Sequence, residues 1–163
     1  MLLKLCGCIA FTLAGLTAGL LRSKSLYARR QFLRSFMVFL QTLATMLRYR
    51  AEDIFTLVQS ASKSASLPSA QPEEHLDFAQ WWLRQTEAMQ PPNALQNSDK
   101  ELLSAFGSQL GASDTEGQLR HIELYQTLFA KQLKQAEETL AQKSRLYRTL
   151  GLFGGLSVGI VLL

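Results

Sequence analysis

The sequence predicts an all-α protein: a cytoplasmic helical bundle of about five to six helices, flanked by one transmembrane helix at each end. Apolar residues make up 47% of the 163-residue chain and charged residues only 18%, and the apolar excess is concentrated at the two ends. Between those ends, apolar residues recur every three or four positions, which is the period of one helix face. Alternating β-branched runs are too few for a sandwich or a barrel.

The first apolar run predicts a transmembrane anchor over residues 1–21. Its uncharged part, residues 5–21, would span roughly 26 Å as a helix, close to the ~30 Å hydrocarbon core of a bilayer. A cleaved secretory signal peptide is the alternative, but the basic stretch that begins at Arg22 is typical of a stop-transfer sequence. We interpret Cys6 and Cys8 as small apolar residues of this helix.

The last apolar run predicts a second anchor over residues 149–163. It is uncharged and short, roughly 22 Å as a helix, but it can cross a bilayer when the chain ends among the lipid headgroups. Glycines recur at every fourth position in both anchors, a spacing that lets membrane helices approach closely. The predicted packing glycines are Gly15, Gly19, Gly151, Gly155 and Gly159.

Basic residues flank both anchors on the side of the middle segment, residues 22–148. Residues 22–50 carry seven basic residues and no acidic one. The positive-inside rule therefore places the middle segment in the cytoplasm and both termini outside it. Nucleic acid is an alternative target for the basic stretch, but its position beside the membrane favours attraction to anionic lipid. The predicted lipid-proximal basic residues are Arg22, Lys24, Arg29, Arg30, Arg145 and Arg148.

From Leu26 onward, apolar residues of the middle segment recur at intervals of three and four, which predicts a long amphipathic helix with a bend near Tyr49. The same apolar pattern continues as far as Ala61. Residues 60–71 are predicted as a loop or frayed helix end, because they are rich in Ser, Ala and Gln and contain Pro68.

The segment Pro-Glu-Glu at 72–74 predicts the start of a third helix, which the prolines at 91–92 end. Trp81 and Trp82 lie side by side on this helix and point about 100° apart. We expect both of them to pack under neighbouring helices. The alternative is that one lies in the core and the other contacts a partner, since tryptophan is enriched in binding hot spots.

Two capping boxes predict the remaining helix starts. Ser98 and Glu101 begin one helix, and Gly111 ends it in the left-handed conformation. Ser113 and Glu116 begin the next helix. No stop signal precedes the second anchor, so this helix and the anchor are predicted to form one rod of about 48 residues, roughly 70 Å long.

The sequence offers no constellation of catalytic or metal-ligating residues. His75 and His121 lie in different predicted helices, and no phosphate-binding glycine loop or nucleophile elbow occurs. Asp114 and Glu116 lie within two turns of His121, but helix capping accounts for both acids. We therefore expect a protein that is not an enzyme and takes no cofactor, metal or small-molecule substrate.

Three segments of the C-terminal half, read together, resemble the stage III sporulation protein AB family. They are the turn Leu-Gly-Ala-Ser-Asp at 110–114, the helix start Gln-Leu-Arg-His at 118–121, and Leu-Tyr-Arg-Thr-Leu-Gly-Leu-Phe-Gly-Gly at 146–155. Tyr49 also matches an aromatic residue at the end of the family's first soluble helix. The family often has an acid before that tyrosine, whereas residues 45–48 here are Thr, Met, Leu and Arg.

The resemblance implies a subunit of the secretion-like channel complex that joins mother cell and forespore during endospore formation. It implies a place in the outer forespore membrane of the mother cell and a helical domain similar to that of type II secretion and type IV pilus platform proteins. The implied partners are other subunits of the channel complex, including its ATPase. We therefore predict a non-enzymatic membrane platform or adaptor subunit.

The alternative function is a membrane-tethered helical regulator that binds anionic lipid or nucleic acid through residues 22–50. A nucleic-acid surface should extend onto the more distal helices. Residues 51–117, however, carry ten acidic residues against three basic ones. We therefore expect no nucleic-acid partner.

Overall fold

The computed structural model describes residues 2–50, 52–69 and 77–162, and within these the side chains of residues 24–143. Over the described part of the chain the structure contains five helices and no strand, so the all-α prediction is confirmed. The helices are α1 (Leu2–Tyr49), α2 (Ile54–Ser64), α3 (Phe78–Met89), α4 (Asn97–Gln109) and α5 (Thr115–Leu162).

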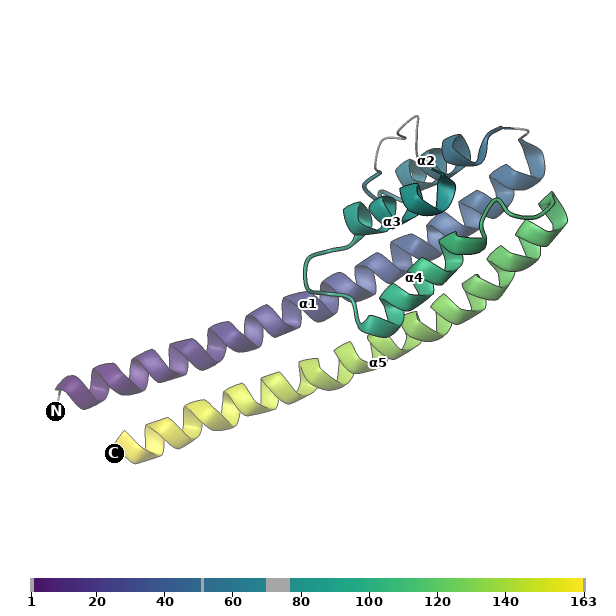
Figure 1. Cartoon of the computed structure of the whole chain (residues 1–163). Coiled ribbons are helices and arrows are strands. Elements are labelled where there is room, and N and C mark those ends of the chain that lie inside the picture. Colours follow the sequence, from purple (N-terminus) through teal and green to yellow (C-terminus); the bar gives the residue numbers. More distant parts are fainter. Residues whose placement is uncertain (1, 51, 70–76, 163) are drawn as a thin grey trace.

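The two long helices, α1 and α5, form an antiparallel hairpin (Figure 1). The N-terminal end of α1 and the C-terminal end of α5 lie at the same end of the molecule. The three short helices lie along the opposite half. The rings of Phe36 and Phe129 meet across the hairpin with their centroids 4.6 Å apart. Each long helix has 48 residues, which corresponds to about 72 Å. As the missing stop signal predicted, α5 runs through the second apolar run without a break.

One face of α1 supplies a large part of the core. Leu33, Phe36, Leu40 and Leu43 recur at intervals of three and four residues and are fully buried. Phe36 also packs edge-on against Phe106 of α4. The aromatic rings of α1 therefore connect α4 and α5. They lie on the face of α1 that helix periodicity predicted to be buried.

Both adjacent tryptophans of α3 are buried, so the prediction that both pack under neighbouring helices is confirmed and neither is available to a partner. Trp81 packs on Phe55 of α2, with ring centroids 5.2 Å apart. Trp82 packs on Phe106 of α4 at 5.3 Å, and its Nε1 donates a hydrogen bond to the Leu103 carbonyl at 2.7 Å. Because α2 and α4 cover different sides of α3, two side chains about 100° apart are both enclosed.

The segment after Tyr49 differs in part from the loop prediction for residues 60–71. Helix α2 continues to Ser64, and Ala61 and Leu67 are buried. Burial of these residues against the core outweighs the weak helix propensity of the Ser-rich sequence. The predicted start of the third helix at 72–74 lies outside the described residues. Helix α3 is described from Phe78, and Asp77 caps it by accepting a hydrogen bond from the Gln80 amide at 2.8 Å.

The predicted capping box of α4 is displaced by two residues. The helix begins at Asn97, and the Asp99 carboxylate accepts a hydrogen bond from the Gln96 amide at 2.9 Å. Ser98 and Glu101 are therefore inside the helix and do not cap it. The helix starts earlier because Asp99 is fixed from the core side, as described below. At the other end, Gly111 has a φ of 87°, the left-handed conformation that glycine adopts at low cost.

The capping box predicted at the start of α5 is displaced by one residue. Asp114, not Ser113, is the capping residue, because its Oδ1 accepts a hydrogen bond from the Gly117 amide at 2.9 Å. Glu116 lies in the first turn, where its charge favours the positive end of the helix. A carboxylate accepts this bond better than a hydroxyl does, which explains the choice between the neighbouring residues.

The predicted anchors over residues 1–21 and 149–163 have their side chains outside the described set, and so have Gly15, Gly19, Gly151, Gly155 and Gly159. Among the residues that were searched, no helix is long and apolar enough to cross a membrane. The division into anchor, bundle and anchor therefore stays a prediction.

Candidate interaction surface

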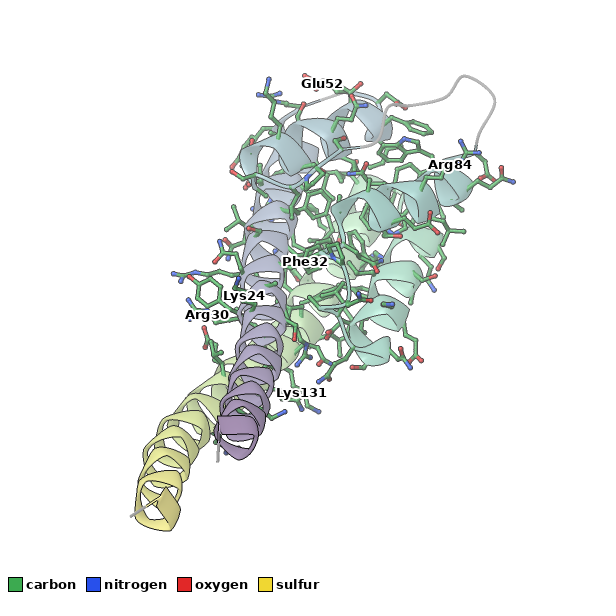
Figure 2. The ribbon with its side chains drawn as sticks, turned by 90° about the vertical axis from the view of Figure 1, so that its left-hand side faces the viewer. Lys24, Arg30, Phe32, Glu52, Arg84 and Lys131 are labelled. Carbon is green, nitrogen blue, oxygen red and sulfur yellow. The ribbon has the colours of Figure 1, made fainter. Side chains whose placement is uncertain are left out.

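The basic residues of α1 separate into a buried and an exposed group. Arg29 is only 2% exposed, so its assignment as a lipid-proximal residue is wrong. Lys24 and Arg34 are exposed, and Arg30 is partly exposed. Figure 2 shows Arg30 on the outer side of α1, whereas Phe32 points toward the short helices. Three further residues assigned to the lipid-proximal group, Arg22, Arg145 and Arg148, lie outside the described side chains.

Arg29 forms a bidentate ion pair with Asp99 of α4, which is fully buried. Arg29 Nε donates to Asp99 Oδ2 at 2.7 Å, and a terminal nitrogen donates to Oδ1 at 2.9 Å. The same terminal nitrogen donates to Gln132 Oε1 of α5 at 3.1 Å. One guanidinium group therefore links three helices that are distant in sequence.

This ion pair is a structural element rather than a free reactive group. Charges that leave water lose several kcal/mol of solvation each, and only good geometry with additional hydrogen bonds compensates that loss. Here Asp99 accepts bonds from Arg29 and from the Gln96 amide, and Arg29 also reaches Gln132. The arrangement fixes the register of α4 on the hairpin, because a shift of one residue would leave both charges buried and unpaired.

The second polar feature is His121, which lies against the aromatic cluster. Its ring is stacked on Phe106 with centroids 5.4 Å apart, and its Nε2 is 2.9 Å from the Phe106 carbonyl oxygen. Tyr125 packs against the same two rings, and desolvation by burial raises the pKa of its phenol. No group of three potential metal ligands occurs among the described side chains. His75 lies outside them.

The exposed face of α1 is the surface most suited to recognition. Exposed positions recur along it with alternating intervals of three and four residues, which gives a ridge that turns slowly around the helix, by about 20° per seven residues. Acidic residues are absent from residues 1–50 of the sequence, so the ridge carries one sign of charge only. We call this surface the basic ridge, and it consists of Lys24, Tyr27, Gln31, Arg34, Val38, Gln41, Thr45 and Arg48.

Sequence reasoning missed the ion pair although a signal was present. Arg29 lies four residues before Leu33 and seven before Phe36, so it shares their buried face. Asp99 has the same relation to Leu103 and Phe106 on α4. A charge in the register of a core face requires a partner of opposite sign, and these two charges supply each other.

The family model described as stage III sporulation protein AB matches residues 4–163. Stage III sporulation protein AB of Bacillus subtilis (strain 168) is 26% identical over 171 residues, covering 99% of this chain and 100% of that protein. No solved structure matches the chain.

Proposed function

The chain belongs to the stage III sporulation protein AB family, and from this premise we propose that it is a non-enzymatic platform or adaptor subunit of a secretion-like channel complex. Family membership implies a role in sporulation. In the proposal, the protein lies in the outer forespore membrane of the mother cell, with its helical bundle in the cytoplasm and both termini on the other side. Its partners are other channel subunits, including the ATPase of the complex.

The observation that carries the proposal is the position of the two chain ends in the antiparallel hairpin. Both chain ends lie at the same end of the hairpin, away from α2, α3 and α4 (Figure 1). Two apolar segments that leave a bundle at one end can enter one bilayer without any linker between bundle and membrane. Such an attachment holds the bundle at a fixed distance and orientation, which is what a platform for other subunits requires.

The polar interior supports a scaffolding role. Arg29 and Asp99 satisfy each other, and the ring nitrogen of His121 meets a backbone carbonyl. These groups hold helices together and point into the packed core. The remaining candidates for recognition are therefore on the surface, as in a subunit that works through its contacts.

The test is purification of the tagged full-length chain from detergent-solubilised membranes of sporulating cells. We expect channel subunits to co-purify, and deletion of the gene to block sporulation at the stage of the engulfed forespore. A matched control is the same tag on an unrelated protein with two membrane anchors. Normal sporulation of the deletion strain would contradict the proposal. Purified tagged chain that contains no channel subunit would contradict it as well.

A further inference from the structure

The basic ridge is long compared with the range of any single surface charge. Lys24 and Arg48 stand at its two ends, and at 1.5 Å per residue they are about 36 Å apart. The ridge is exposed along its whole length and includes two apolar or aromatic side chains, Tyr27 and Val38. A surface of this shape matches an elongated partner.

The N-terminal part of the ridge has the chemistry of a binding hot spot. The Tyr27 side chain is 55% exposed, and the Arg30 guanidinium carbon lies 5.3 Å from the centre of its ring. Arg30 Nε is buried and has no hydrogen-bond partner. Tyrosine and arginine are among the residue types enriched in hot spots.

A lipid surface accounts for only one end of this ridge. If lipid headgroups lay level with Lys24, Arg34 would stand about 15 Å above them and Arg48 about 36 Å above them. The Debye length at physiological ionic strength is about 8 Å, so these two charges would interact weakly with the membrane. Their alignment with Lys24 points to a partner that extends along the helix.

The described faces of α4 and α5 would offer a second copy of the chain no continuous acidic surface to match the ridge. On α5 the exposed acids Glu116 and Glu123 are separated by Arg120, and Lys131 and Lys134 precede the next acids. On α4 the exposed Lys100 and Glu101 are adjacent. These mixed faces would oppose part of the basic ridge with like charge.

We propose that the basic ridge of α1 docks an acidic helix of a different protein. Carboxylates of that helix pair with Lys24, Arg34 and Arg48, while apolar side chains cover Tyr27 and Val38. A helix fits because the ridge presents its contacts every three or four residues, and a partner helix that coils around α1 can follow the slow turn of the ridge. The inference deepens the proposed function, on which it rests for taking the partner to be a channel subunit.

A photo-crosslinking amino acid at Gln31 tests the docking in the full-length chain. Gln31 is exposed at the centre of the hot spot, and Ala105, exposed on α4, is the matched control position. In sporulating cells we expect Gln31 to give one protein adduct whose crosslinked peptide is an acid-rich helix, and Ala105 to give none. Adducts at Gln31 with phospholipid, with nucleic acid or with a second copy would overturn the proposal, as would the lack of any adduct.

A charge exchange tests whether the contact is electrostatic. Arg34→Glu should lower the yield of the adduct about tenfold, and a lysine in place of the contacted carboxylate of the partner should restore it. Arg120→Glu, an exposed arginine on α5, should leave the yield unchanged. If Arg34→Glu lowers the amount of the chain in the membrane, the test uses Arg34→Gln instead, provided that this variant is present at the normal amount. An unchanged yield with either Arg34 variant at normal abundance overturns the proposal.

The two proposals fail in different ways. An acid-rich partner that is no channel subunit would support docking on the ridge and contradict the platform function. Channel subunits that co-purify with the chain while Gln31 gives no adduct would support the platform function and contradict docking on the ridge.

Discussion

Asp99 serves two structures at once, the start of α4 and the core of the bundle. Its carboxylate accepts the Gln96 amide and both donors of Arg29. The side chain is fully buried, so water cannot replace either partner. Loss of the carboxylate would therefore leave the Arg29 guanidinium charged and buried.

Asp99→Ala should lower the free energy of unfolding by about 3–5 kcal/mol, because it leaves an uncompensated buried charge. The measurement is urea unfolding of the full-length chain in detergent micelles, followed by circular dichroism. Glu52→Ala is the control. Glu52 lies 3.6 Å from Arg50 in an exposed pair, and removal of such a pair changes stability by less than about 1 kcal/mol. Equal effects of the two substitutions would contradict a structural role for the buried pair.

Gly107 of α4 lies directly against the ring of Trp82 of α3. A Cβ at this position would overlap the ring of Trp82, which its hydrogen bond to Leu103 and its contact with Phe106 hold in place. The helix accommodates the indole at this point only because residue 107 has no side chain. Trp82 is thereby buried together with the group that binds its Nε1.

Gly107→Ala should destabilise the protein by about 1–3 kcal/mol, because overpacking against a fixed ring exceeds the gain in helix propensity of about 1 kcal/mol. Tryptophan fluorescence during urea unfolding measures the change. Ser104→Ala, on the exposed side of the same helix, should stay within about 0.5 kcal/mol of the parent chain. A Gly107→Ala chain as stable as its parent would show that α3 can move away from α4 at little cost.

Single residues were the hardest features to predict. The burial of Arg29 follows from its register with Leu33 and Phe36, but its place in a basic run favoured a membrane-facing interpretation. The burial of both tryptophans depends on which helices flank α3, and one helix's own periodicity carries no information about that. The burial of the tryptophans therefore depends on tertiary contacts, which local sequence does not encode.

At the scale of elements, apolar periodicity predicted the long helices and their buried faces well. The breaks at Tyr49 and Gly111 also coincide with helix ends in the structure. The helix starts were misplaced by one or two residues. At α4 the acid of the capping box is Asp99 and not Glu101, and at α5 the motif offers a serine and an aspartate side by side. The choice between them depends on which group receives the first free amide of the helix.

Asp114→Ala should cost about 1 kcal/mol of stability, the usual magnitude for losing a capping side chain. Its Oδ1 accepts the Gly117 amide at the start of α5, so that amide would lose its acceptor. Thermal unfolding of the full-length chain in micelles gives the comparison. Ser113→Ala is the matched control and should be nearly neutral. If Ser113→Ala proved the more damaging of the two, the start of α5 would have been assigned to the wrong residue.

For the whole molecule, the hairpin of α1 and α5 brings the two chain ends together, and with them the two predicted anchors (Figure 1). The basic residues between those anchors predict a cytoplasmic bundle. The arrangement of α2, α3 and α4 on one half of the hairpin could not be predicted. It depends on the Arg29–Asp99 pair and on aromatic contacts between residues far apart in sequence.

A cysteine-labelling experiment tests the predicted topology. In vegetative cells that produce the chain, Glu101→Cys should be protected from a membrane-impermeant thiol reagent, and a cysteine added after Leu163 should react. Cys6 and Cys8 are replaced by serine to remove the background, and cell lysis should expose the position at 101, which is on the surface of α4. Labelling of Glu101→Cys in intact cells would contradict the predicted cytoplasmic location of the bundle.

The order of synthesis gives the hairpin a further consequence. Arg29 contacts Gln132, which follows it by 103 residues in the chain. At the usual translation rate of about 5–20 residues per second, the ribosome needs roughly 5–20 s to reach that partner. Throughout this interval the aromatic face of α1 has been made but its cover on α5 has not. Completion of the core is therefore a late event in the life of the nascent chain, and a chain that stops before α5 leaves Phe36 and its neighbours exposed to aggregation.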